Sequence, residues 1–167
     1  MNVYDAKELE RIKKVSEQND RLEDWLKQQR SECEVAIEPF LKSLTIKLDT
    51  RDAVNKISEL QSMSLVYRQS LSEKINYFLN RRSRETVKHK KLKQDKFIFY
   101  ATGFGVKTSA SETAMLIAAH LGENSRTLEL IEAHVEFLRD NVKILESLSY
   151  SVKNIVDLAN HLSKMPL

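Results

Sequence analysis

The scarcity of glycine and proline is the strongest constraint on the fold. Only three Gly and two Pro occur in 167 residues, and neither type occurs between Phe40 and Thr102. Because chains use these residues for tight turns, a fold built from many short strands is disfavoured. A content of 41% hydrophobic and 31% charged residues is enough for one compact core surrounded by polar helix faces. We therefore predict an all-α protein made of long helices.

A first helix is expected over residues 5–37, where apolar residues recur at spacings of mostly three, four and seven. Its narrow stripe consists of Leu9, Ile12, Val15, Leu22, Trp25, Leu26, Cys33 and Ala36. Proline disfavours helical geometry at the residue before it, so Pro39 is expected to end or bend this helix. We interpret the short segment that follows, residues 41–48, as part of a connection.

A second helix is expected to begin after a cap at Asp49 or Thr50 and to continue until Gly103, since no Gly or Pro interrupts it. Gly105 is expected to open the loop that follows, because glycine tolerates the left-handed conformation found where helices end.

The spacing of Ser109 and Glu112 is that of a capping box, which predicts a short third helix over residues 110–121. Residues 122–125, Gly-Glu-Asn-Ser, are expected to end this helix and to lead into a fourth.

The C-terminal segment has the clearest periodicity in the chain, with apolar residues at alternating spacings of three and four over roughly four heptads. We predict that this seam mediates oligomerisation, through Leu128, Ile131, Val135, Leu138, Val142, Leu145, Val152 and Val156. A second stripe widens the apolar face: Leu130, Phe137, Ile144, Leu148, Ile155, Leu158 and Leu162. Such a helix must pack against other helices of the chain, other copies of the chain, or both.

Positive charge is concentrated in one short segment. The whole chain has a net charge of +3, whereas residues 81–96 contain eight basic and two acidic residues, a net charge of +6. Like charges three and four residues apart destabilise a helix unless something neutralises them. The segment is therefore typical of a surface that binds a polyanion, of which nucleic acid is the commonest.

Large apolar residues follow directly: Phe97, Ile98, Phe99 and Tyr100. Aromatic rings are stacking platforms for unpaired bases, although each of these rings is also suited to core packing. Tyr100 is the best stacking candidate, because its hydroxyl group favours an interface over a dry core. The predicted nucleic-acid-binding residues are Arg81, Arg82, Arg84, Lys88, Lys90, Lys91, Lys93, Lys96 and Tyr100.

Nothing in the sequence indicates catalysis. The four histidines lack metal-ligand spacing and the single Cys33 provides no thiolate cluster, so we expect no enzyme, catalytic residue, metal or cofactor. One cysteine cannot form an internal disulfide and the chain begins without a leader pattern, so a cytoplasmic location is expected. The longest apolar run, residues 115–119, is far shorter than the roughly 18 residues of a membrane span, so no membrane partner is expected.

Three stretches of the C-terminal half form a family pattern. KHKKLKQDKFIFYATG, residues 88–103, is a lysine-rich helix ending in aromatics and a glycine; LGENSRTLEL, residues 121–130, is a short acidic connection; and VEFLRDNVKILESLSYSVKNIVDL, residues 135–158, forms the final helix. In this order and spacing, residues 65–160 resemble the recombination mediator proteins of tailed phages, the UvsY-like family.

The resemblance implies a non-enzymatic, phage-encoded protein of the host cytoplasm that binds single-stranded DNA. It also implies a homo-oligomer, with a ring as one form, that helps to load a RecA-like recombinase in place of a single-strand-binding protein. Lysines of the matching helix would contact DNA: Lys88, Lys90, Lys91, Lys93 and Lys96. On this interpretation residues 1–48 are an N-terminal helical extension, and residues 49–167 are the mediator-like core with its basic helix and oligomerisation helix.

Two alternatives remain open. In one, the protein is a non-enzymatic assembly or interaction module whose basic segment binds an acidic protein surface. In the other it is an RNA-binding regulator, because charge and stacking do not distinguish ribose from deoxyribose without contacts to the 2′-hydroxyl group.

Overall fold

The structure is a computed structural model that describes residues 6–45, 51–103, 105 and 107–162. It contains three long helices, α1 (Ala6–Lys42), α2 (Arg51–Ile98) and α3 (Ala110–Leu162). A 3₁₀ turn, Ser43–Thr45, follows α1, and a π-helical segment, Phe99–Gly103, follows α2. No strand occurs among the described residues, which confirms the prediction of an all-α protein.

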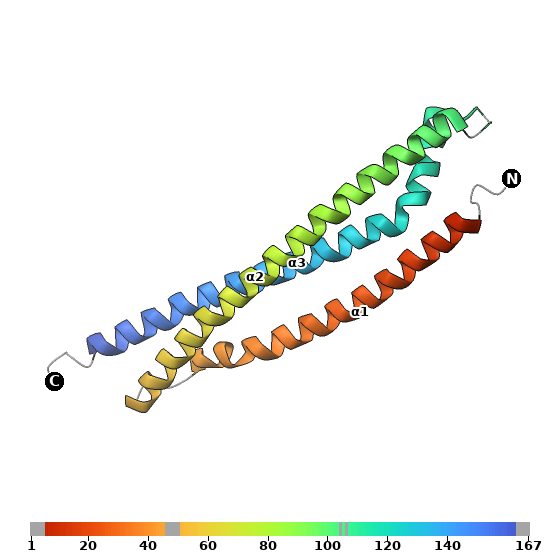
Figure 1. The fold of residues 1–167 in the computed structure, drawn as a ribbon. Coiled ribbons are helices and arrows are strands. Elements are labelled where there is room, and N and C mark those ends of the chain that lie inside the picture. The colour runs from red at the N-terminus through yellow and green to blue at the C-terminus, as the bar shows by residue number, and fades with distance from the viewer. Residues whose placement is uncertain (1–5, 46–50, 104, 106, 163–167) are drawn as a thin grey trace. The chain divides into compact units, whose positions relative to one another are not determined.

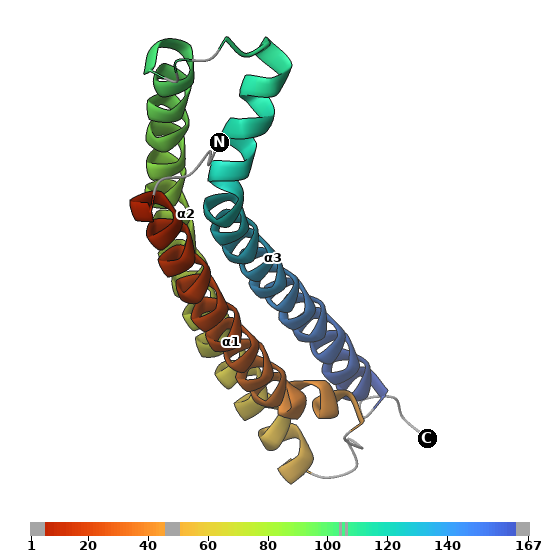
Figure 2. The same ribbon diagram turned by 90° about the vertical axis from the view of Figure 1, so that its right-hand side faces the viewer.

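The chain divides into two compact units, and each takes a stretch from all three helices. The first unit contains Met1–Lys27 and Phe78–His134, and the second contains Gln28–Tyr77 and Val135–Leu167. Within each unit α2 runs in the direction opposite to α1 and α3 (Figures 1 and 2). Both of the segments distinguished in the sequence, 1–48 and 49–167, thus contribute to both units.

The core of the first unit is a contact between rings and aliphatic side chains of three helices. Phe78 of α2 lies with its ring centroid 4.6 Å from that of His134 of α3 and 5.7 Å from that of Trp25 of α1. Leu26 and Ile131 are buried in the same unit. Each such side chain contributes about 1.5–3 kcal/mol by leaving water.

The core of the second unit is built mainly from aliphatic side chains. Those contributed by α3 are Val135, Leu138, Leu145, Leu148 and Val152, and those from α1 and α2 are Cys33, Ile37, Phe40, Ile57 and Leu71. The helix partners that the apolar face of α3 requires are therefore supplied, at least in this part, by helices of the same chain.

Pro39 was predicted to end or bend the first helix. It does not end the helix, because α1 continues to Lys42. Proline removes one helical hydrogen bond, which here would join its nitrogen to the carbonyl group of Val35. Burial of Phe40, in the same turn, offsets that loss. The predicted cap at Asp49 or Thr50 lies outside the described residues, and α2 begins at Arg51.

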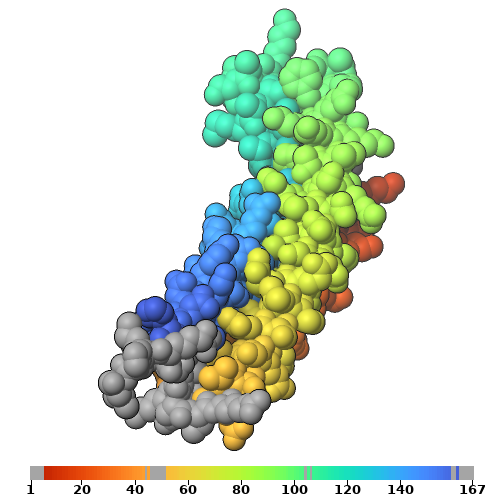
Figure 3. Space-filling model, turned by 90° about the vertical axis from the view of Figure 1, so that its left-hand side faces the viewer, coloured from red at the N-terminus to blue at the C-terminus, as the bar shows by residue number. Residues whose placement is uncertain are grey.

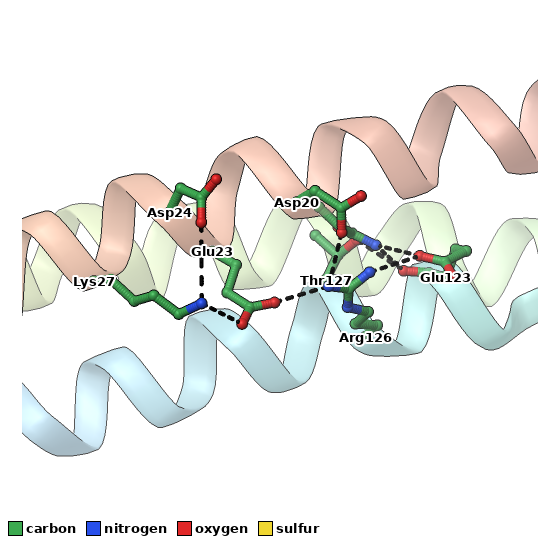
Figure 4. A network of polar contacts seen from close by, with 8 residues as sticks. Asp20, Glu23, Asp24, Lys27, Glu123, Arg126 and Thr127 are labelled. Atoms are coloured by element: carbon green, nitrogen blue, oxygen red, sulfur yellow. Dashed lines mark hydrogen bonds and ion pairs between the residues drawn. The ribbon is translucent and has the colours of Figure 1, made fainter.

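The predicted break at residues 122–125 is also wrong, since α3 is one helix where two were expected. Gly122 inside a helix costs about 1 kcal/mol relative to alanine. Polar contacts with α1 next to it offset this cost (Figure 4). Asn19 donates a hydrogen bond of 2.7 Å to the carbonyl oxygen of Glu123, and the guanidinium group of Arg126 lies 2.9 Å from Asp20 and 2.8 Å from Glu23.

The predictions for the loop between α2 and α3 are confirmed. Gly105 has a φ of 70°, in the left-handed region. At the start of α3 the backbone N–H of Ser109 donates to the carboxylate of Glu112 at 2.8 Å, and the N–H of Glu112 donates to Oγ of Ser109 at 3.2 Å. These are the two reciprocal bonds of a capping box, and the first of them lowers the pKa of Glu112.

Candidate nucleic-acid interface

The basic segment, residues 81–96, forms the C-terminal third of α2 and lies wholly within the first unit. At 3.6 residues per turn, Arg84, Lys88 and Lys91 point within about 60° of one another, and all three are exposed. We call them the outer row. Lys90, Lys93 and Phe97 form a second exposed line, also within about 60°, which we call the rim row.

Three of the eight cations are held by carboxylates of the same unit: Arg82 by Glu132 at 2.8 Å, Lys88 by Glu85 at 2.8 Å, and Lys96 by Glu8 at 3.0 Å. Within the described part of the chain the other five form no ion pair: Arg81, Arg84, Lys90, Lys91 and Lys93. The predicted DNA-contacting residues therefore separate into two groups. Arg82, Lys88 and Lys96 are paired within the unit, and Lys96 is only 18% exposed. Of the five that form no ion pair among the described residues, Arg81 is half-buried and the other four are exposed.

A groove lies between the end of α2 and the start of α3 in this unit. Its volume is about 940 Å³, and its apolar surface comes mainly from Phe97, Ala114, Ile117, Ala118 and Leu121. A second hollow of about 400 Å³ shares Lys93, Phe97 and Ile117 with it and adds Lys90. Lys93 and Phe97 of the rim row thus line both hollows, and Lys90 lines the second. Figure 3 shows the green part of α2 and the teal part of α3, which together form this surface.

The charge of the groove is of one sign. Its cationic side chains are Lys93 and Lys107, with His89 beside them, and neither hollow has an Asp or Glu among its described lining residues. The hydroxyl groups of the groove bond within the protein. Thr102 donates to the carbonyl group of Ile98 at 2.8 Å, Thr108 contacts Thr113 at 2.8 Å, and Ser125 contacts His89 at 3.2 Å.

The structure corrects the assignment of the stacking ring. Tyr100 is buried, with 4% of its surface exposed, in a cluster with Ile117 and Leu121. The ring lines the groove, but too little of it is exposed to serve as a stacking face. Phe97 and Phe99 are exposed instead, by 59% and 45%.

Tyr100 is fixed by a chain of polar contacts that also involves α1 and α3. Its hydroxyl group lies 2.6 Å from Nε2 of His120, and Nδ1 of His120 lies 3.0 Å from the carboxylate of Glu8. The same carboxylate accepts from Arg11 at 2.9 Å and pairs with Lys96. Burial alone would raise the pKa of Glu8, but the hydrogen bonds from Arg11, Lys96 and His120 lower it to about 2.

These contacts define the hydrogen positions. An ionised Glu8 can only accept, so Nδ1 of His120 must carry the proton that joins them. Burial lowers the pKa of His120, although the bond to Glu8 opposes this, and a neutral ring then offers Nε2 as an acceptor. Tyr100 therefore donates its hydroxyl hydrogen to His120. The hydroxyl group of Tyr100 and both ring nitrogens of His120 are thus hydrogen-bonded, which explains why a tyrosine is tolerated in the core.

The predicted oligomerisation residues are largely enclosed by their own chain. Ile131 is buried in the first unit, and Val135, Leu138, Leu145 and Val152 are buried in the second. The others, Leu128, Val142 and Val156, are half-buried. A second copy could reach the buried ones only if the bundle opened. The second apolar stripe is more available, since Ile144, Ile155 and Leu158 are exposed.

Sequence reasoning named Phe97 as a candidate ring but left it out of the predicted binding residues, and it did not anticipate Lys107 in the groove or the role of Glu8 beside it. Phe97 falls in line with Lys90 and Lys93 at helical spacing, whereas Leu92 and Lys96 fall on the neighbouring, inward side. Spacing alone does not separate the rings, because Tyr100 lies only about 20° from Lys93; its burial with Ile117 and Leu121 does. Lys107, which lines the groove, carried no comparable signal, because it lies in the loop. Glu8 resembled ordinary helix surface until α2 and α3 were placed against it.

Two other kinds of feature are absent from the residues that the structure describes. None of the helices there has a stretch that is both long enough and apolar enough to cross a membrane. No three side chains among their His, Cys, Asp and Glu residues are grouped so that they could hold a metal ion.

Comparison with known proteins adds no relative. The chain matches no protein-family model, no curated protein and no solved structure.

Proposed function

We propose that the protein binds single-stranded DNA along the C-terminal third of α2 and acts there as a recombination mediator. One observation carries the proposal: among the described residues, five cations of this helix segment form no ion pair, and two exposed aromatic rings follow them along the chain. The cations are Arg81, Arg84, Lys90, Lys91 and Lys93, and the rings are those of Phe97 and Phe99. Cations of this kind bind phosphates by releasing counter-ions, while rings favour unpaired bases.

The electrostatics set the size of the expected salt effect. For single strands the slope of log affinity against log salt is about −0.7 for each phosphate that is neutralised. Five contacts would give a slope of about −3.5 per chain. Cations already held by carboxylates, such as Lys96, would add little, because their pairing must first be broken.

The mediator role rests on the resemblance of residues 65–160 to the UvsY-like family. In that role the protein would assemble as a homo-oligomer, displace a single-strand-binding protein and load a RecA-like recombinase. The exposed part of the second stripe, Ile144, Ile155 and Leu158, offers an apolar surface for contacts between copies.

DNA binding is tested by the double variant Lys90→Glu/Lys91→Glu in gel-shift titrations over a range of salt. We expect the wild type to prefer single strands to duplex, and the variant to lose affinity by at least about tenfold and about 1.4 units of salt slope. The matched control is Lys56→Glu/Lys153→Glu, which makes the same charge change at exposed positions of the second unit. Equal losses in both variants would show that only net charge matters, and the proposed site would be abandoned.

The mediator step has its own test. The wild type should accelerate assembly of a RecA-like recombinase on DNA that a single-strand-binding protein already covers, and the Lys90→Glu/Lys91→Glu variant should not. If the wild type bound DNA without any such acceleration, the protein would be a DNA-binding protein of another kind.

An assembly or interaction module is the second candidate, and exposed apolar residues of α2 favour it. Three neighbouring residues of the second unit, Met63, Leu65 and Val66, are exposed by 53%, 58% and 73%. A stable oligomer that ignores oligonucleotides would support this function over DNA binding. Competition between RNA and DNA of equal length would separate an RNA-binding regulator from both, since only RNA contacts through the 2′-hydroxyl group would favour RNA.

A further inference from the structure

The groove beside the rim row is large enough for a ligand and is distinct from the outer row. Its volume, about 940 Å³, lies in the upper part of the range of roughly 300–1,000 Å³ that is usual for ligand sites. Lys93 stands on its α2 wall and Lys107 lines it from the loop, while Lys90 lines the smaller hollow beside it. The outer row, in contrast, points away from the groove on the same helix.

The combination of lining groups restricts what the groove can hold. With lysines and no described carboxylate in its lining, it favours an anionic ligand. With Phe97, Ile117 and Ala118 as its apolar surface, it also favours a flat or apolar group. An unpaired nucleotide has both parts, a phosphate and a base with two apolar faces.

We propose that the groove holds unpaired bases of the single strand, that the phosphates next to these bases lie on Lys90 and Lys93, and that the strand continues past the groove onto Arg84 and Lys91 of the outer row. This inference rests on the proposed function and assigns a place to the bases. Phe97 supplies the stacking face at the entrance, because its ring is exposed and lines both hollows.

The same site predicts little preference for sequence. A base edge is read by donors and acceptors held in fixed positions, but the hydroxyl groups of Thr102, Thr108 and Ser125 are engaged within the protein, and the lysines of the groove have flexible side chains. Stacking and shape remain, and these accept any base. Large purines and small pyrimidines should therefore bind with affinities that differ by less than about tenfold.

The test compares two strands that have the same phosphates. One is oligothymidine of about 12 nucleotides, a length within the range of single-strand sites, and the other is a strand of equal length made of abasic sugar units. Wild-type protein should bind the normal strand at least about fivefold more tightly, as expected if one or more bases stack.

Filling the groove should remove this difference. Ala118 lines the groove, whereas its neighbour Ala119 does not, and both are exposed on α3. Ala118→Trp should bind the two strands with equal affinity, close to that of wild type for the abasic strand. Ala119→Trp, the matched control, should keep the wild-type difference. Circular dichroism and thermal unfolding of both variants show whether each is folded, and Phe97→Ala provides a second variant that removes the stacking face without filling space.

The possible outcomes distinguish failure of the groove proposal from failure of the proposed DNA binding. Equal wild-type affinity for both strands would overturn the groove proposal while leaving DNA binding intact, and so would a base preference that survives in both Ala118→Trp and Phe97→Ala. In that case an acidic amphipathic peptide becomes the better occupant. Failure of wild type to bind either strand would instead remove the proposed function. Lys91→Glu should lower the affinity for both strands by the same factor, because Lys91 belongs to the outer row.

Discussion

The hydroxyl group of Tyr100 lies 2.6 Å from Nε2 of His120, and the other ring nitrogen of that histidine lies 3.0 Å from the carboxylate of Glu8. The three residues come from the π-helical segment, α3 and α1. The wall of the groove is therefore tied to the N-terminal helix by a buried polar chain. A substitution in this chain of contacts should therefore lower the unfolding free energy more than it lowers the affinity for DNA.

Tyr100→Phe tests that chain with the smallest change available. Removal of the hydroxyl group leaves Nε2 of His120 buried without its donor, which should cost about 1–3 kcal/mol of unfolding free energy. Urea unfolding at neutral pH measures the loss. The control is Tyr150→Phe, at a position that is 72% exposed, where stability should change by less than about 0.5 kcal/mol. Equal stability of wild type and Tyr100→Phe would mean that the bond contributes nothing.

The low pKa of Glu8 predicts how acid affects stability. Its folded pKa is about 2 and its ordinary value is 4.5, so the ionised carboxylate stabilises the fold above about pH 4.5. This contribution is lost as the pH falls from there through 2. The groups that face Glu8 are Arg11, Lys96 and His120, and all three interact best with the ionised form.

The measurement compares wild type with Glu8→Gln across pH. Wild type should be more stable at neutral pH, and the difference should shrink steadily below about pH 4.5. Glu10→Gln, an exposed position on the same helix, should follow the wild-type curve. A difference that stays constant down to pH 2, or that grows, would contradict the assigned contacts.

Loss of charge at two lysines of the basic segment should affect two different properties, stability at one and DNA affinity at the other. Lys96 pairs with Glu8 and is mostly buried, whereas Lys91 is exposed without an ion pair in the described residues. Lys96→Met should lower the unfolding free energy by about 1–3 kcal/mol, because it removes a charged partner from a half-buried carboxylate. Lys91→Met should leave stability within about 0.5 kcal/mol and weaken binding to single-stranded DNA. The reverse pattern would show that the two lysines have been assigned to the wrong groups.

Leu145 and its neighbour Ile144 test which side of α3 forms the core. Leu145 is fully buried in the second unit and Ile144 is 42% exposed. Leu145→Ala should cost about 2–5 kcal/mol, and Ile144→Ala much less. Denaturant unfolding gives the cost, and light scattering gives the mass in solution. If Leu145→Ala dissociated an oligomer without lowering the stability of the chain, the heptad seam would lie between copies.

The fold was predictable where local chemistry alone decides it. Scarce glycine and proline, together with the capping box of Ser109 and Glu112, were enough for the all-α class and for the start of α3. Pro39 and Gly122 were misjudged for one reason. Each weakens a helix locally, and each is outweighed by contacts with distant residues, such as that of Asn19 with the carbonyl group of Glu123.

The sequence predicted the cluster of positive charge in the candidate site, but not which of its side chains form the exposed surface. The sequence shows eight cations, but it does not show which of them are paired with carboxylates. That depends on residues brought close by folding, such as Glu132, which pairs with Arg82. Tyr100 was assigned to DNA because its hydroxyl group suggested an interface. Its actual partner, His120, lies 20 positions away on another helix, and no local pattern connects the two.

The shortness of the outer and rim rows limits what one chain can cover. From Arg84 to Phe97 the two rows rise about 20 Å along the helix, at about 1.5 Å per residue, so one chain contacts only a few nucleotides of a strand. A single protein would therefore have a small footprint and only modest affinity. Tight binding would depend on avidity, with several chains lined up along one strand, so that affinity should climb steeply with the length of the DNA.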